Sequence, residues 1–343
     1  MSNQQPPRGV HLNGSIPLAN AEEVFRVTSS IVGERLHRIP DGETGVRTNW
    51  IGWQMDVLVR NPSLEMVPPD PAAYATLPHF KLRPEASIRE LVFDQLGYAD
   101  AALASYAVFS QLKRTGVIPT QYRLQVSLPT PLAPVAAFIV EEEQAILLPA
   151  YERAMVAELE KIASGIAHAE LAIQWDVAVE FGLLEGVAFT SYAHAKTGII
   201  EQLVRLGKYV PLDVELGYHL CYGDADHKHF VEPEDTTRLV DVANGICAGL
   251  KRSLNWISMP VPRNRSDEAY FAPLKNLQLH PETELYLGLV HFTDGVEGTR
   301  RRIEAAQRVI ADFGVATECG FGRRPSETIP DLLRIHSEVA APY

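Results

Sequence analysis

The chain has 343 residues, of which 46% are hydrophobic and 22% charged, and its formal net charge is −12. This length suits one α/β barrel or two smaller domains. The negative charge disfavours nucleic acid as a partner, and no apolar run is long enough to span a bilayer. The N-terminal residues lack a signal-peptide pattern, and three cysteines are too few for a disulfide framework. We therefore expect a cytoplasmic protein with no membrane partner.

Short apolar runs recur along the chain, and a helical pattern follows most of them. Strands alternating with helices predict an α/β fold with a parallel sheet. Eight runs favour a single (β/α)₈ TIM barrel formed by residues 1–343 over an open doubly wound sheet. The eight predicted strands are Gly9–Asn13, Leu36–Pro40, Tyr122–Ser127, Leu171–Asp176, Asp213–Cys221, Leu254–Met259, Glu284–His291 and Val315–Glu318.

Helix boundaries are also visible in the sequence. Asn20 and Glu23 resemble a capping box, which predicts a helix that begins there and ends near Gly33. Near the other end of the chain, the apolar stripe of residues 303–313 predicts a helix that Gly314 terminates.

The stretch between the second and third predicted strands is unusually long. Residues 45–120 contain a proline-rich part, 62–71, and a helical pattern, 87–112. We expect a helical insertion over one end of the barrel that acts as a lid or binding element. A decoration that only packs against the barrel is an equally good interpretation.

Potential metal ligands lie at the predicted carboxyl ends of the strands, where barrels of this kind place their active sites. His219 and Cys221 are two residues apart, a spacing that points both side chains to the same face of a strand. Cys319 follows the eighth strand. One imidazole and two thiolates form a catalytic zinc set with an open position. Buried packing cysteines are the alternative, which we adopt for Cys247 on the apolar side of a helix.

These motifs resemble the C-terminal catalytic barrel of cobalamin-independent methionine synthase. That family lies in a wider superfamily with epoxyalkane:coenzyme M transferase and uroporphyrinogen decarboxylase. The most specific match is His219–Asp224, similar to H-M-C-Y-S-D, and Glu318–Gly320 is similar to D-C-G. Further matches are Gly14–Pro17 to G-S-F-P, Gly42-Glu43 to G-E and Ile173–Asp176 to I-Q-I-D.

The resemblance implies roles for residues at the strand ends. The histidine and the two rim cysteines ligate zinc, which binds and activates a small-molecule thiol. Asp176 and Glu43 bind an ammonium group of this thiol, Ser15 orients its other end, and Arg323 or Arg324 meets a carboxylate or sulfonate. Loop capping by the two acids and a surface position for the arginine are the structural alternatives.

The sequence also departs from the family. The glutamate that ligates zinc after the sixth strand is replaced here by Pro260, which cannot ligate. The fourth ligand is then water, substrate or another carboxylate. The catalytic histidine of the family aligns near His291 or Thr293. We name His291, Asp294 and Asp176 as candidate catalytic residues, and His291 or Asp294 as the acid that protonates the leaving group.

The leading hypothesis is a zinc-dependent thiol alkyltransferase or methyltransferase, in which a metal-bound thiolate attacks an electrophilic carbon of an alkyl donor. An epoxide-opening thiol transferase is a variant of it. A metal-independent decarboxylase or lyase would instead use Asp41, Asp176 and His291. A non-catalytic binding protein is disfavoured by the many charged groups at the strand ends. The alkyl donor, the thiol and the oligomeric state, a homo-oligomer included, stay open.

Overall fold

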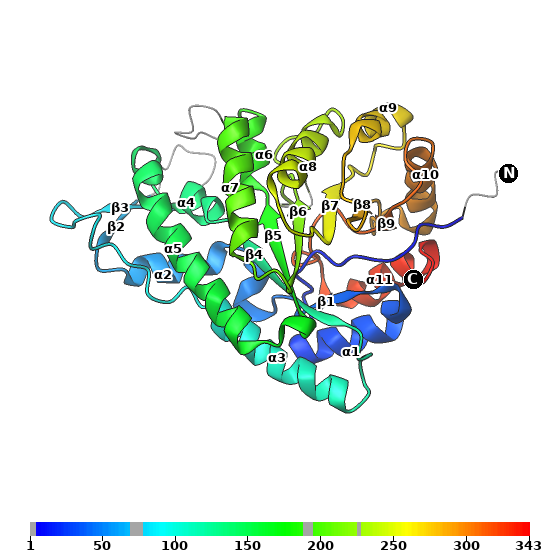
Figure 1. Cartoon of the computed structure of the whole chain (residues 1–343), viewed down its shortest axis with the longest axis horizontal. Helices are drawn as coiled ribbons and strands as arrows, with labels where there is room; N and C mark the ends of the chain where they lie inside the picture. The colour runs from blue at the N-terminus through cyan, green and yellow to red at the C-terminus, as the bar shows by residue number, and fades with distance from the viewer. Residues whose placement is uncertain (1–4, 69–77, 188–194, 225–227) are drawn as a thin grey trace.

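The computed structural model describes residues 5–68, 78–187, 195–224 and 228–343. Its centre is a curled, parallel sheet of seven strands in the order β1-β4-β5-β6-β7-β8-β9 (Figure 1). Seven of the eight predicted strands form this sheet. The strands are β1 (Arg38–Pro40), β4 (Arg123–Pro129), β5 (Leu171–Val177), β6 (Glu215–Leu220), β7 (Trp256–Pro260), β8 (Glu284–Gly288) and β9 (Gly314–Val315).

The N-terminal segment predicted as the first strand lies beside the last one. Val10 forms an isolated parallel bridge with Val315, and the backbone N–H of His11 donates to the carbonyl of Val315 at 2.9 Å. On its other side, the N–H of Val10 donates to the carbonyl of Arg35 at 2.8 Å, close to the start of β1. The segment therefore forms backbone hydrogen bonds with residues near both edges of the seven-stranded sheet.

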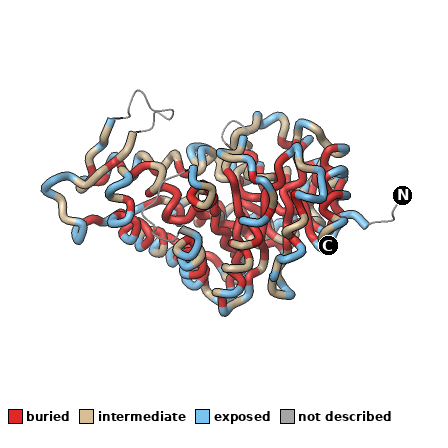
Figure 2. Tube along the Cα trace, turned by 90° about the horizontal axis from the view of Figure 1, so that it is seen from above, coloured by how far each residue is buried: buried red, intermediate tan, exposed pale blue. Residues whose placement is uncertain are grey.

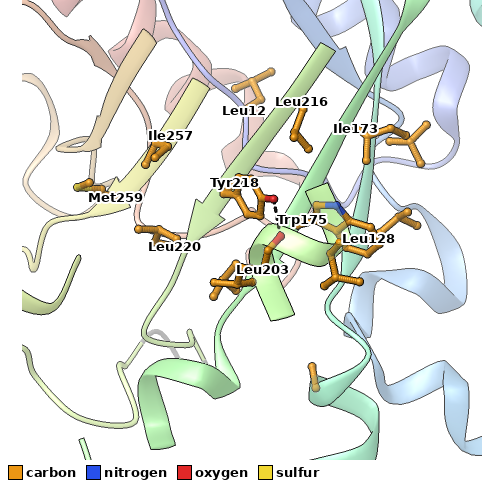
Figure 3. Packing of buried hydrophobic residues seen from close by; sticks show 14 of the residues in the cluster. Leu12, Leu128, Ile173, Trp175, Leu203, Leu216, Tyr218, Leu220, Ile257 and Met259 are labelled. Carbon is orange, nitrogen blue, oxygen red and sulfur yellow. Dashed lines mark hydrogen bonds between the residues drawn. The ribbon is translucent and has the colours of Figure 1, made fainter. Parts of the chain in front are cut away.

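Alternation along the strands separates two environments. On β6, Leu216, Tyr218 and Leu220 belong to the main hydrophobic core (Figure 3). The intervening His219 points into the interior of the curled sheet, where it lines a cavity. Because side chains alternate with a period of two, the strands place apolar residues outward and polar residues inward near their ends.

Helices surround the sheet (Figure 1). The predicted capping box is confirmed, since Asn20 accepts from the N–H of Glu23 at 3.0 Å where α1 begins. The helices are α1 (Ala21–Val32), α2 (Met55–Arg60), α3 (Tyr98–Arg114), α4 (Leu132–Phe138), α5 (Glu141–Gly165), α6 (Val179–Leu184), α7 (Ala195–Tyr209), α8 (Thr237–Gly249), α9 (Glu268–Phe271), α10 (Gly295–Gln307) and α11 (Ile329–Val339). Within the described ranges, no helix is long and apolar enough to cross a membrane.

The prediction for Gly314 is wrong. Helix α10 ends at Gln307, and Gly314 is the first residue of β9 rather than a helix terminator. A Cβ at Gly314 would lie 2.6 Å from the ring of Tyr286 on the neighbouring strand. The glycine therefore allows the close approach of β8 and β9, a requirement that helical periodicity does not reveal.

The segment between β1 and β4 is more varied than the predicted helical insertion. It contains two short 3₁₀ helices, Gly45–Asn49 and Gly52–Gln54, followed by α2. An antiparallel hairpin of β2 (Leu64–Val67) and β3 (His79–Leu82) then lies away from the main sheet, and its residues are less buried than the centre (Figure 2). Helix α3, which follows, packs against α1 and α5 as an ordinary helix of the outer layer.

Candidate metal and substrate site

A cavity of about 240 Å³ lies at the carboxyl ends of the strands. A larger depression of about 660 Å³ lies elsewhere, along α5 and α7, and holds none of the residues predicted to carry chemistry. The smaller cavity contains seven of the predicted site residues and is therefore the candidate site. Its lining is Asn13, Ser15, Glu43, Trp50, Asp176, Ala178, His219, Cys221, Gly223, Asp224, Cys319, Gly320 and Arg323.

Three of these residues form a potential metal centre. The ligand atoms of His219, Cys221 and Cys319 all lie within 4.8 Å of one another. His219 and Cys221 share the inward face at the end of β6, where the N–H of Cys221 donates to the carbonyl of Val177 at 2.8 Å and keeps the chain extended. Cys319 comes from the loop after β9. The structure thus brings together the three ligands that the sequence predicted.

The donor set suits a soft divalent metal. His219 is buried, and neither of its ring nitrogens has a hydrogen-bond partner within the described part of the chain. Buried polar atoms are ordinarily hydrogen-bonded, so an unpaired buried imidazole beside two thiols fits a site for a metal ion. Three nitrogen and sulfur donors match a catalytic zinc site that keeps one position open.

The two rim cysteines differ electrostatically. The adjacent Cys319 thiol and burial raise the pKa of Cys221 well above the usual thiol value. The pKa of Cys319 is well below that value, because Cys221 and the nearby imidazole of His219 favour its thiolate against the effect of burial. A thiolate is the form of cysteine that binds metal. The lowered pKa of Cys319 therefore already favours one of the two thiolates that a zinc site would need.

Two acidic side chains form another wall of the cavity. Burial, and then the charge of Asp176, raises the pKa of Glu43 well above its ordinary value. Burial also raises the pKa of Asp176, although hydrogen bonds from Gln174 and Trp50 oppose the shift. Two neighbouring buried acids repel each other. The charge of Arg47 partly offsets this for Glu43, and a substrate cation would relieve the remaining repulsion.

Backbone strain is located at the same wall. Among the described residues other than glycine, Glu43 and Trp50 have positive φ angles, 47° and 49°. The turn before them is held by Asp41, which accepts from the N–H of Glu43 at 2.8 Å and pairs with Arg47 at 2.7 Å. Strained residues that line a cavity commonly serve binding, because the surrounding contacts must maintain them.

Ser15 and Arg323 also reach the cavity. The hydroxyl of Ser15 accepts from the N–H of Gly322 at 3.2 Å, which ties the first loop to the loop that carries Cys319. Arg323 lies 3.9 Å from Asp224, and burial together with the charge of Cys319 raises the pKa of Asp224 to about 7. These contacts place a positive and a negative group at the cavity rim.

Two predicted catalytic residues lie outside the described cavity lining. His291 is buried, with Nε2 2.9 Å from the carbonyl oxygen of Val261 and Nδ1 3.4 Å from Glu318. Asp294 pairs with Arg302 through two contacts of 2.7 and 2.8 Å. Their catalytic roles stay predictions.

The sequence analysis did not identify several residues at or next to the site. Trp50 follows no strand of the sheet, so no strand-end rule indicated it. Asp224 belongs to a matched motif, but its burial against Cys319 is visible only in three dimensions. Glu318 has one oxygen 3.0 Å from Nε2 of His229 and the other facing His291, a contact between distant segments.

The structure also locates Pro260, which stands where the resembled family has its glutamate ligand. Pro260 ends β7 and is buried, and its carbonyl accepts from the hydroxyl of Tyr270 at 3.0 Å. It offers no side-chain ligand.

Sequence comparisons and structural comparisons give different results. No family profile and no curated protein sequence matches the chain. Solved structures do match. A B12-independent methionine synthase from Shewanella sp. W3-18-1, in complex with selenomethionine, has 13% identity and a TM-score of 0.60, over 97% of this chain and 96% of that one.

Two further structures agree. A vitamin-B12 independent methionine synthase, so described, from Listeria monocytogenes has 15% identity and a TM-score of 0.54, over 99% and 100% of the two chains. A methyltransferase from Methanosarcina mazei has 12% identity and a TM-score of 0.56, over 98% and 95%. The chain therefore has the fold of the B12-independent methionine synthase-like proteins, which is the resemblance that its sequence motifs predicted.

Proposed function

We propose that the protein is a zinc-dependent thiol alkyltransferase, with methyl transfer as the leading reaction. The observation that carries the proposal is the cluster of His219, Cys221 and Cys319, whose ligand atoms lie within 4.8 Å of one another at the wall of a cavity. The methyltransferase fold of the structural neighbours supports it, because their likeness extends over nearly the whole chain.

A bound zinc ion would be held by these three side chains and would lower the pKa of a thiol at its open position, so that a thiolate is available at neutral pH. The chemistry that zinc would supply is a thiolate able to attack an electrophilic carbon of the alkyl donor, with a C–S bond forming as the bond to the leaving nitrogen or oxygen breaks. Asp176 and Glu43 bind an ammonium group of the thiol substrate. Ser15 orients its other end, and Arg323 pairs with its anionic group.

The leaving group requires a proton, and the proposal assigns this role to His291. Asp294 is engaged by Arg302, which lowers the pKa of Asp294 although partial burial opposes the shift. Burial also lowers the pKa of His291, so the choice between them rests on position. His291 contacts Glu318, the residue next to Cys319 in the chain, and this proximity to the metal-site loop is why the proposal prefers it.

The architecture that we propose is a closed barrel. Segment 9–13 would act as the eighth strand, because its backbone bonds reach both β9 and the chain before β1. Within segment 45–120, Trp50 would form the part of the lid that covers the cavity.

Metal content tests the proposal. We expect one zinc per chain, by elemental mass spectrometry, in protein purified without added metal. Cys221→Ser and Cys319→Ser should each lose it, whereas Cys247→Ser, a matched control away from the cavity, should retain it. Metal-free protein that catalyses decarboxylation or a lyase reaction would contradict the proposal.

Product analysis separates the two transfer reactions. The zinc-loaded protein is incubated with a thiol and with one of two kinds of donor, an N-methyl or O-methyl compound or an epoxide. We expect an S-methylated product from the methyl donors and no product from the epoxide. An S-hydroxyalkyl product from the epoxide would favour the epoxide-opening transferase.

A further inference from the structure

Gln174 is a fully buried amide inside the sheet, two residues before Asp176 on β5. Its Oε1 lies 2.7 Å from Nε2 of His11 and accepts from Nε1 of Trp256 at 3.2 Å. Its Nε2 donates to the carbonyl of Asn13 at 2.8 Å and to Oδ1 of Asp176 at 2.9 Å. Both ends of the amide are thus fully engaged.

The orientation of this amide is determined by its neighbours. The indole N–H of Trp256 can only donate, so the atom that faces it must be the carbonyl oxygen of Gln174. His11 must then carry its proton on Nε2, and burial keeps this ring neutral by lowering the pKa of His11 to about 3. Trp256 reaches the amide because its neighbour Gly217 lacks a Cβ, which would lie 2.0 Å from the indole.

The consequence is a fixed donor aimed at Asp176. With Oε1 turned toward His11 and Trp256, the NH₂ group of Gln174 faces the opposite side. There its two short hydrogen bonds go to Asn13 and Asp176, and the hydroxyl of Ser127 lies farther away at 3.3 Å. A charge-assisted hydrogen bond of this kind is stronger than a neutral one and restricts the carboxylate to one rotamer. Without it, repulsion from the nearby Glu43 would favour a different position for the Asp176 carboxylate.

We propose that Gln174 is a positioning residue. Its amide, oriented by Trp256 and His11, holds the Asp176 carboxylate where it receives the ammonium group of an amino thiol. This inference rests on the proposed function, because it assumes that Asp176 binds such a group. A purely structural Gln174 would instead tie the N-terminal segment to β5 and affect all ligands alike.

The test compares two thiols of nearly equal size, 2-aminoethanethiol and 2-mercaptoethanol, which bind zinc-loaded protein in a calorimeter. In Gln174→Met, the Kd of the amino thiol should rise about tenfold, the expected effect of losing one charge-assisted hydrogen bond. The Kd of 2-mercaptoethanol should change by less than about twofold, and zinc content should be unchanged. Equal weakening of both thiols would overturn the proposal.

Gln54→Met is the matched control. Gln54 is also fully buried, accepts from the hydroxyl of Tyr151 at 2.9 Å and donates to the carbonyl of Leu96 at 3.0 Å. It makes no contact with Asp176 in the described residues, so its replacement should leave the ratio of the two Kd values unchanged. A change in that ratio as large as in Gln174→Met would contradict a specific role of Gln174.

Trp256→Phe is the second variant, in case Gln174→Met does not fold. It keeps a ring beneath the guanidinium of Arg38, which lies 4.2 Å from the ring centroid, and removes only the N–H. The preference for the amino thiol should fall about threefold, and an unchanged preference would overturn the orienting role. If the unmodified protein shows no such preference, this inference fails, while zinc-dependent binding of 2-mercaptoethanol still supports the zinc–thiol function.

Discussion

The two ends of the parallel sheet carry opposite kinds of charge arrangement. At the amino ends of the strands, Arg38 pairs with Glu215 at 2.5 Å and with Glu284 at 2.7 Å. Arg123 adds a contact of 2.8 Å to Glu215, and His37 one of 2.7 Å to Glu284. Each of these acids has a cation beside it.

At the carboxyl ends, groups of like charge are gathered instead. Glu43 and Asp176 share one wall, and two thiols with Asp224 share another. The described residues supply Arg323 as the cation in this cavity lining. The difference indicates that the amino end stabilises the fold, and it supports our proposal that the carboxyl end binds a metal and a substrate ammonium.

Removing the central cation of the amino end should have the largest effect on stability. Arg38→Met removes the buried central cation from the half-buried Glu215 and Glu284, and should lower the free energy of unfolding by about 3 kcal/mol in urea denaturation. Arg114→Met, at an exposed position at the end of α3, should change it by less than about 0.5 kcal/mol. Equal stability of both variants would contradict the structural role of the amino end.

Replacing one of the two acids Glu43 and Asp176 should raise the free energy of unfolding rather than lower it. Asp176→Asn removes a repelled charge, so the metal-free protein should become more stable by about 1 kcal/mol at pH 7.5 while losing the preference for amino thiols. Asp213→Asn, an exposed control that pairs with His168, should change neither. A destabilised Asp176→Asn protein would show that this carboxylate supports the fold rather than binding.

The pH dependence of stability tests the same difference between the two ends of the sheet. Although burial opposes the shift, His37 and Arg38 lower the pKa of Glu284 to about 2. A lowered carboxyl pKa stabilises the fold above the unfolded value of about 4.5, and this contribution is lost as pH falls from there toward 2. Glu284→Gln should therefore lose about 2 kcal/mol near pH 6 and almost nothing near pH 2 in denaturation experiments. A constant loss across this range would contradict the ion-pair explanation.

Asp224 should titrate in the reverse sense. Its pKa is raised to about 7, so its folded-state contribution is favourable at low pH and is lost as pH rises through 7. In metal-free protein, Asp224→Asn should raise the melting temperature at pH 8 and leave it nearly unchanged at about pH 3.5, below the unfolded-state pKa of 3.8. The same gain at both pH values would show that the effect is not a titration.

Cys247→Ala should have the smallest effect on the site. This residue is buried on α8 away from the cavity, so the variant should lose only about 1 kcal/mol of stability and keep its zinc. Loss of zinc would require a different ligand set.

The strand alternation and the shared face of His219 and Cys221 were predictable because both depend on local spacing, whereas the position of Cys319 was predicted from its place after the last strand. His219 and Cys221 share a face whenever that segment is a strand, and apolar runs such as Leu171–Val177 identify the strands. Contacts that depend on distant segments were not predictable. Two examples are the indole of Trp50 in the cavity lining and the packing of Gly314 against Tyr286. Each depends on two separate elements lying next to each other.

The most direct test of the central claim is zinc X-ray absorption on the metal-loaded protein, before and after addition of a thiol. The ligand set of one histidine and two cysteines predicts two sulfur neighbours around zinc, with nitrogen or oxygen completing the shell, and a third sulfur after the thiol binds. Zinc surrounded only by oxygen and nitrogen, or a sulfur count that the thiol does not change, would contradict a zinc-activated thiol in this cavity.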